Sequence, residues 1–146
     1  MTPTLIGRWQ TRLALLGTLG MLVSLPFCVA VGSAAPLAVV AWVAVLGLAW
    51  DALYSFLQAF RWERDWPAAF AVLAAIIEGV VVYRLATSLG LAGVPSNLSG
   101  ELFIAQYAIV WVVTFLFTQG PMRVLFPWWR FHGGRIVPGV SSRQRR

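Results

Sequence analysis

Four apolar stretches occupy most of this 146-residue chain and restrict what it can fold into. They run from about 13 to 32, 36 to 60, 67 to 89 and 102 to 119. A run of about 20 apolar residues is long enough to cross the hydrocarbon core of a bilayer as an α-helix. A helix also satisfies its own backbone polar groups, which the core demands. We therefore predict an all-α polytopic membrane protein with four transmembrane helices and short loops.

The composition excludes the soluble and disordered alternatives. Sixty per cent of the residues are hydrophobic and only 11% are charged, so a soluble domain of this size would lack the polar residues for its surface. Disorder is excluded because the chain has ample apolar surface to bury. The net charge of +6 does not indicate nucleic-acid binding, because most arginines flank apolar stretches and form no soluble basic face.

The apolar stretches divide the chain into three parts. Residues 1–12 form an N-terminal segment, 13–120 the four-helix transmembrane domain, and 121–146 an interfacial segment with a basic tail. The first stretch, followed by Gly32-Ser-Ala-Ala-Pro36, also has the form of a signal peptide with a small-residue cleavage site. We expect an uncleaved helix instead, because another apolar stretch follows almost at once.

The distribution of arginine predicts the orientation. Arginines lie before the first stretch, between the second and third, and after the fourth, whereas the two remaining loops contain none. Cytoplasmic loops of membrane proteins carry the excess of positive charge, so both termini should be cytoplasmic. The chain contains arginine but no lysine, which suggests a bacterial genome of high GC content and hence the cell (inner) membrane.

Six polar residues fall within the apolar stretches and are candidates for a site inside the helix bundle. Polar and ionisable residues at such positions normally face the bundle interior and are often functional. At 3.6 residues per turn, those of the second stretch share one helical face with Gly47. The six are Asp51, Tyr54, Gln58, Glu78, Arg84 and Gln106.

Asp51 and Glu78 admit two interpretations. They should lie at neighbouring depths, and two like charges in a medium of low dielectric cannot both ionise cheaply. A pair with one carboxyl protonated would bind a proton or a cation. In the structural alternative, which we favour, Asp51 hydrogen-bonds to Tyr or Trp side chains. Glu78 or Glu101 then pairs with Arg84 and keeps the helices in register.

Aromatic and basic residues cluster at the expected cytoplasmic interface. Trp rings and arginines are typical of headgroup depth, where they contact lipid or a partner protein. The basic tail should attract anionic lipid headgroups. The candidate docking residues are Trp62, Arg64, Trp66, Trp128, Trp129, Arg130 and His132.

The remaining residue types do not indicate catalysis or a cofactor. With one Cys and one His, neither of the usual zinc ligand sets nor a Ser-His-Asp triad can be assembled, and no His lies within a span for haem. We expect no cofactor, no metal and no catalytic residue.

We therefore expect a non-catalytic structural or assembly subunit of a larger membrane complex. The alternative is a small oligomeric channel or proton-coupled transporter that uses Asp51 and Glu78. An enzyme acting on lipid or quinone is less favoured.

Overall fold

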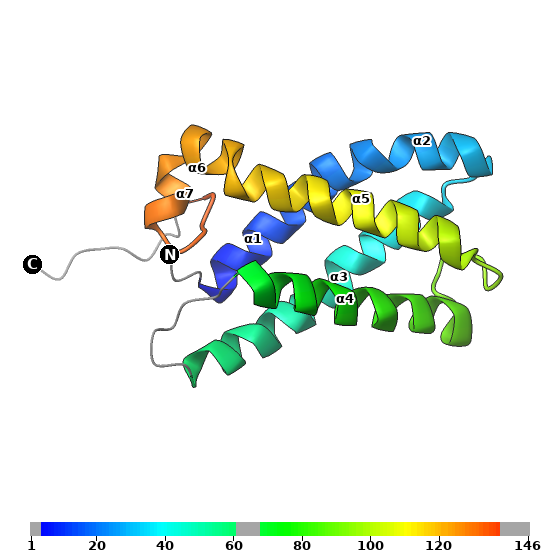
Figure 1. Ribbon diagram of the computed structural model, residues 1–146, viewed down its shortest axis with the longest axis horizontal. Helices are drawn as coiled ribbons and strands as arrows, with labels where there is room; N and C mark the ends of the chain where they lie inside the picture. Colours follow the sequence, from blue (N-terminus) through cyan, green and yellow to red (C-terminus); the bar gives the residue numbers. More distant parts are fainter. Residues whose placement is uncertain (1–3, 61–67, 138–146) are drawn as a thin grey trace, which may run out of the picture.

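The computed structural model describes residues 4–60 and 68–137, and all secondary structure in these ranges is helical. Seven α-helices and two π-helical segments follow one another along this part of the chain (Figure 1). The α-helices are α1 (Leu5–Leu15), α2 (Met21–Val31), α3 (Ala35–Ala59), α4 (Ala68–Leu85), α5 (Gly100–Gln119), α6 (Pro121–Leu125) and α7 (Pro127–Phe131). The π-helical segments are η1 (Leu16–Gly20) and η2 (Ala86–Gly90).

Four of the helical stretches in the described ranges are long and apolar enough to cross a membrane. They are Leu5–Val31, Ala35–Ala59, Phe70–Gly90 and Gly100–Leu125. The predicted all-helical class with four such helices is therefore confirmed. The first helix begins at Leu5 and not near residue 13, because α1, η1 and α2 are continuous. Arg8 and Arg12 consequently lie within the helix and not ahead of it.

Local sequence signals explain where the helices begin and end. The side chain of Thr4 accepts a hydrogen bond from the amide of Gly7, and Ser99 accepts one from Leu102, as N-caps do. Pro36 stands in the first turn of α3, where its missing N–H is no loss. Gly32 ends α2 with a φ of 69°, a left-handed conformation that glycine adopts without strain.

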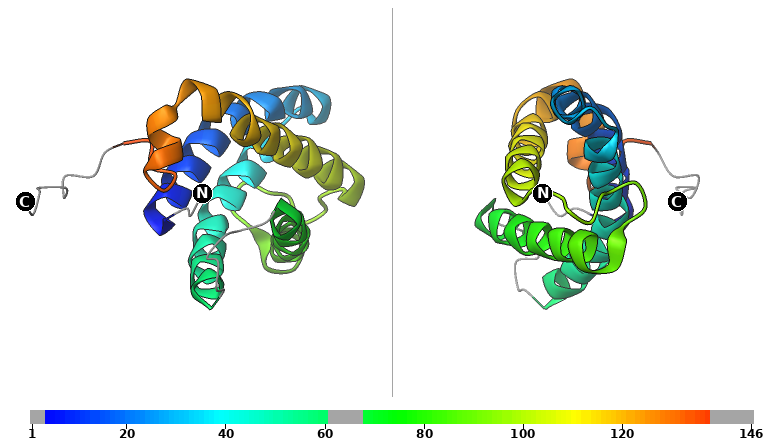
Figure 2. Two further views of the ribbon diagram at one scale, coloured as in Figure 1. Left: turned by 60° about the vertical axis from the view of Figure 1, so that its left-hand side comes forward. Right: turned by 90° about the vertical axis from the view of Figure 1, so that its right-hand side faces the viewer.

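α3 contacts the first helix (α1, η1 and α2) on one side and α4 on another (Figure 1 and Figure 2). Its valines Val39, Val40 and Val43 are buried and pack with residues of η1, α4 and α5. α2 runs back along the first half of α3, whereas α4 contacts α3 and α5 less extensively. Seen from the end of the bundle, α3, α4 and α5 lie on three different sides (Figure 2, right).

Small residues on the first helix allow α3 and α5 to approach it closely. Gly20 lies against Val40 and Val110, and a Cβ there would be 3.1 Å from Cγ1 of Val40. Ser24, one turn further, is fully buried. Small residues spaced four apart let helix backbones approach each other. η1 contains Gly17 and Gly20 and shifts the helical phase between Arg12 and Ser24 by one residue.

The short helices α6 and α7 fold back onto the first helix. Trp129 donates its indole N–H to the hydroxyl of Thr11 at 2.7 Å, and Met122 and Trp129 pack with Leu15 in a small second core. The amide of Thr4 donates to the carbonyl of Gly133 at 2.8 Å. The two ends of the described chain therefore lie together at one end of the bundle.

Candidate functional site

A buried charged cluster joins three helices. The guanidinium of Arg12 in α1 lies between the carboxylates of Asp51 in α3 and Glu78 in α4. Its Nε donates to Oδ2 of Asp51 at 2.8 Å and its Nη1 to Oε1 of Glu78 at 2.7 Å. Nη2 donates to a second oxygen of each carboxylate, at 3.2 Å and 3.3 Å. Arg12 therefore binds both acids bidentately.

Helical spacing explains how these side chains meet. Gly47 precedes Asp51 by one turn on the same face of α3. A Cβ at Gly47 would collide with the guanidinium of Arg12, so the absence of a side chain there makes room for it. The planar guanidinium carries donors in a fixed fork that matches two carboxylates, which a lysine ammonium cannot do.

The cluster is shielded from solvent. Asp51 is 6% exposed and Glu78 is 5% exposed. Removing ions from water is unfavourable unless they are paired and their hydrogen bonds are satisfied. Arg12 satisfies both acids at once, which explains why two carboxylates can lie close together here. Within the described residues, Arg12–Asp51 and Arg12–Glu78 are the ion pairs that the structure forms.

The charged cluster borders a cavity of about 560 Å³. Its lining comes from α1, α3, α4, α5 and the α6–α7 segment, and combines apolar residues such as Val43 and Val110 with hydroxyl and amide side chains. Thr114, Thr118 and Gln119 extend the polar lining along α5 toward α6. Small-molecule sites are clefts of about 300–1,000 Å³ with a few placed polar groups, and this cavity has both properties.

A second buried polar contact lies elsewhere in the bundle. The amide nitrogen of Gln106, only 2% exposed, donates to the hydroxyl of Ser24 at 2.9 Å and to the carbonyl of Pro36 at 2.7 Å. These bonds tie α5 to α2 and α3. Gln106 also lines the cavity, as do Thr114 and Thr118 further along α5.

The other polar residues proposed from the sequence take different positions. Tyr54 lines the cavity and donates to the carbonyl of Ala74 at 3.4 Å. Gln58 is buried and accepts a hydrogen bond from Arg8 at 2.9 Å. Arg84 is exposed on the outer side of α4 and makes no ion pair within the described residues.

The proposed pairing of Glu78 or Glu101 with Arg84 is therefore wrong. Glu78 pairs with Arg12, and Glu101 is exposed without an ion pair to the described residues. The expected hydrogen bonds from Tyr or Trp to Asp51 are likewise absent among the described residues, and Arg12 takes their place. The sequence reasoning missed Arg12, which it treated as a charge preceding the membrane. A signal was present, because Arg8 and Arg12 are one helical turn apart and so share a face.

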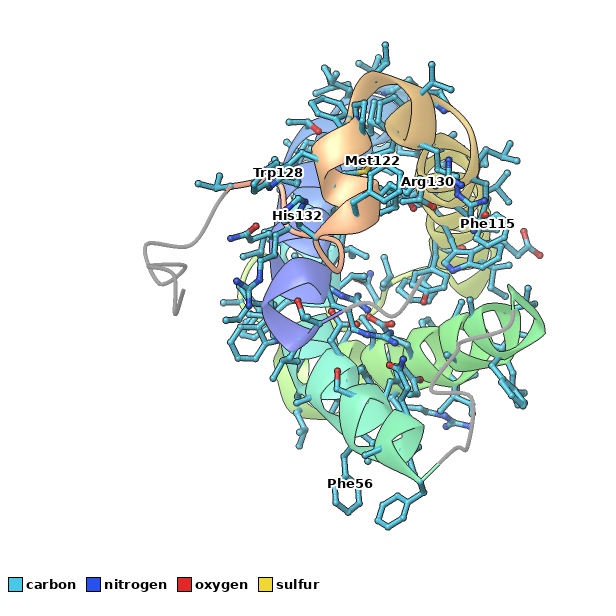
Figure 3. The ribbon with its side chains drawn as sticks, turned by 90° about the vertical axis from the view of Figure 1, so that its left-hand side faces the viewer. Phe56, Phe115, Met122, Trp128, Arg130 and His132 are labelled. Carbon is cyan, nitrogen blue, oxygen red and sulfur yellow. The ribbon has the colours of Figure 1, made fainter. Side chains whose placement is uncertain are left out.

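The proposed docking residues are only partly described. Trp62, Arg64 and Trp66 lie outside the described residues. Trp128 and His132 stack at 3.4 Å between ring centroids on the outside of α7, and Arg130 lies over the ring of Phe131 (Figure 3). Trp129 differs, because it is 7% exposed and packs inward against the first helix. It therefore anchors α7 and does not offer a docking surface.

These features suggest a multi-pass helical membrane protein with a charged site at an internal cavity. No protein-family model matches the chain, and no curated protein or solved structure shows significant similarity to it. Within residues 4–60 and 68–137, no group of three or more His, Cys, Asp and Glu side chains is placed to hold a metal ion. The arrangement places ionic and hydrogen-bonding groups at the wall of this cavity.

Proposed function

We propose that the chain spans the cell membrane four times with both termini in the cytoplasm. The arginine distribution supports this orientation, because the arginine-rich segments all fall on one side of a four-span protein. The contact between Thr4 and Gly133 also fits, since it brings the two described ends to the same end of the bundle. The cavity then lies nearer the cytoplasmic face, because Gly7 and Gly134 at that end of the bundle are part of its lining.

We further propose that the protein is a small channel or proton-coupled carrier. One observation carries this proposal: the buried Arg12–Asp51–Glu78 cluster lies on the wall of a cavity and not in a packed core. A charge within a membrane span is unfavourable by at least about 2.5–3.5 kcal/mol, so charges at a cavity are functional candidates by default.

The shared guanidinium suggests how protonation would act. When either carboxylate takes up a proton, its attraction to Arg12 weakens while the other carboxylate still holds the guanidinium. Arg12 would then move toward the remaining carboxylate. Because the three residues lie on α1, α3 and α4, this movement changes how those helices are held together at the cavity.

Ion flux in liposomes tests this proposal. The purified protein is reconstituted in liposomes that contain an indicator dye for H⁺, Na⁺ or K⁺, and a gradient of the matching ion is imposed. We expect flux above that of empty liposomes, and its loss in Asp51→Asn and Glu78→Gln without loss of folding. Glu101→Gln is the matched control, because Glu101 is an exposed acid that does not line the cavity. No flux of any of the three ions, or unchanged flux in both variants, would reject the proposal.

A second candidate is the assembly subunit expected from the sequence. The observation that favours it is that contacts within the described chain bury only 17% to 39% of each candidate span. Much of the apolar surface is thus available to lipid or to other subunits. Trp128, Arg130 and His132 are exposed beside it at one end of the bundle. Native mass spectrometry after gentle extraction distinguishes the two candidates. Different polypeptides bound to the chain support the subunit, and a homomeric species together with flux supports the carrier.

A further inference from the structure

A second hollow lies on the outside of the bundle, between α4 and α5. This groove has a volume of about 470 Å³ and a lining that is almost wholly apolar or aromatic. Tyr83, Phe103, Tyr107 and Trp111 supply its aromatic surface. It adjoins the cavity of the charged cluster, because Ala75, Tyr107 and Trp111 line both hollows. Between the two, the hydroxyl of Tyr107 donates to the carbonyl of Ala75 at 2.8 Å.

Glycines shape this groove. A Cβ at Gly79 would be 2.8 Å from Cε1 of Tyr107, and a Cβ at Gly100 would be 3.2 Å from the hydroxyl of Tyr83. The tyrosines can therefore lie flat against the opposite helix. Phe103 is 3% exposed and stacks on Tyr107 with 5.6 Å between ring centroids. The groove floor is thus a packed aromatic surface, with small or aliphatic side chains such as Ala108 and Ile104 at its edge.

Arg84 is the one charged side chain among the described residues that line this groove. Arg84 is exposed, and its side chain makes no hydrogen bond or ion pair with the described residues. It lies about 9 Å from the end of the helical stretch at Gly90, so its long side chain can reach headgroup depth. In the proposed topology this is the side opposite the other arginines.

The length of the groove matches one leaflet. From Arg84 to Val72 its α4 side covers about 18 Å, and half of the hydrocarbon core is about 15 Å. The groove begins beside Gly100, the first residue of α5, where the free amides and positive end of the helix dipole favour an anion. Glu101 is in the same turn but outside the groove lining.

We propose that this groove binds an anionic phospholipid of the outer leaflet. Its phosphate contacts Arg84 and one acyl chain lies on the aromatic floor toward Val72. Apolar contacts alone would not select a lipid, because the surrounding acyl chains are equally apolar. The guanidinium supplies the selectivity, because it binds phosphate with charge-assisted hydrogen bonds.

Tryptophan quenching tests the site, because Trp111 lies in the groove. The protein is reconstituted in vesicles of phosphatidylcholine that contain brominated phosphatidylglycerol or brominated phosphatidylcholine, and the fluorescence lost on Trp111→Phe isolates the local signal. We expect phosphatidylglycerol to occupy the site about fivefold more strongly, which corresponds to about 1 kcal/mol for one arginine. Arg84→Gln should remove this preference, and Arg84→Lys should retain most of it.

Two control variants distinguish the contribution of the lipid headgroup from that of its acyl chain. Arg123→Gln changes an exposed arginine outside this groove and should leave the preference unchanged. Ala108→Phe fills the groove and should lower the Trp111 quenching by both brominated lipids. Equal preference in the wild type and Arg84→Gln would overturn the proposal. So would displacement of the lipid by inorganic phosphate, because that would indicate a simple anion site.

Discussion

The Nη1 of Arg12 lies 2.7 Å from Oε1 of Glu78, although the two residues are 66 positions apart in the chain. The same guanidinium holds Asp51, so one cation from the first helix pairs with acids from the next two spans. This relationship is central to the proposed site, because it places three charges at the wall of the cavity. Its consequences for stability can be tested apart from transport.

Arg12→Met should be among the most destabilising single substitutions in the chain. It leaves Asp51 and Glu78 buried without a cation, and breaking a buried ion pair from one side costs about 3–5 kcal/mol. Thermal unfolding in detergent should show a large decrease in midpoint. Arg12→Lys should rescue only part of the loss, because an ammonium cannot bind both carboxylates bidentately. The control is Arg123→Met, which removes an exposed arginine and should have little effect.

Gly47→Ala should disturb the same cluster without removing a charge. The new Cβ would collide with the guanidinium of Arg12, and overpacking of this kind costs about 1–3 kcal/mol. Gly17→Ala is the matched control, because nothing lies within 4 Å of a Cβ built there. We expect Gly17→Ala to be neutral or slightly stabilising in the same thermal assay. Equal effects of the two substitutions would contradict the close approach of Arg12 to α3.

Gln106 and Ser24 should be energetically coupled. Each of Gln106→Leu and Ser24→Ala removes the hydrogen bond of 2.9 Å between them. Hydrogen bonds between transmembrane helices contribute about 0.6 kcal/mol on average. A double-mutant cycle on thermal unfolding should therefore show a double variant less destabilised than the sum of the two single variants. Strict additivity would mean that this bond contributes nothing.

Gly7→Ala should release the α6–α7 segment from the first helix. A Cβ at Gly7 would collide with the carbonyl oxygen of Gly133, and a backbone atom cannot move aside cheaply. Met122, which is 2% exposed, reports on this release when it is replaced by Cys in a Cys28→Ser background. Labelling by a maleimide should be slow in that background and faster once Gly7→Ala is added. Gly17→Ala again serves as the control and should leave the labelling slow.

The proposed topology predicts that both ends of the chain are accessible only from the cytoplasm. Reporter proteins that are active on one side of the membrane, fused in turn to each terminus, should both report the cytoplasmic side. A reporter inserted in the 91–99 loop should report the opposite side. A periplasmic signal from either terminus would contradict the orientation derived from the arginines.

The sequence determined the helical class and the number of apolar spans. Runs such as that from Ala35 to Ala59 are long and apolar enough to cross a membrane as helices, so composition and length suffice for this inference. It also identified Asp51, Glu78 and Gln106 as interior side chains, because polar groups in such runs avoid lipid. These inferences depend only on the local chain.

Only the tertiary structure decided which groups meet. Hydropathy placed Arg12 ahead of the first span, and the favoured interpretation paired Arg84 with Glu78 or Glu101. In the structure Arg12 points inward to Asp51 and Glu78, whereas Arg84 is exposed on α4. The cavity and the outer groove likewise depend on how α4 and α5 are placed against their neighbours. The physical reason is that helical periodicity specifies one face of each helix, whereas the partner of that face depends on the relative rotation and tilt of separate helices.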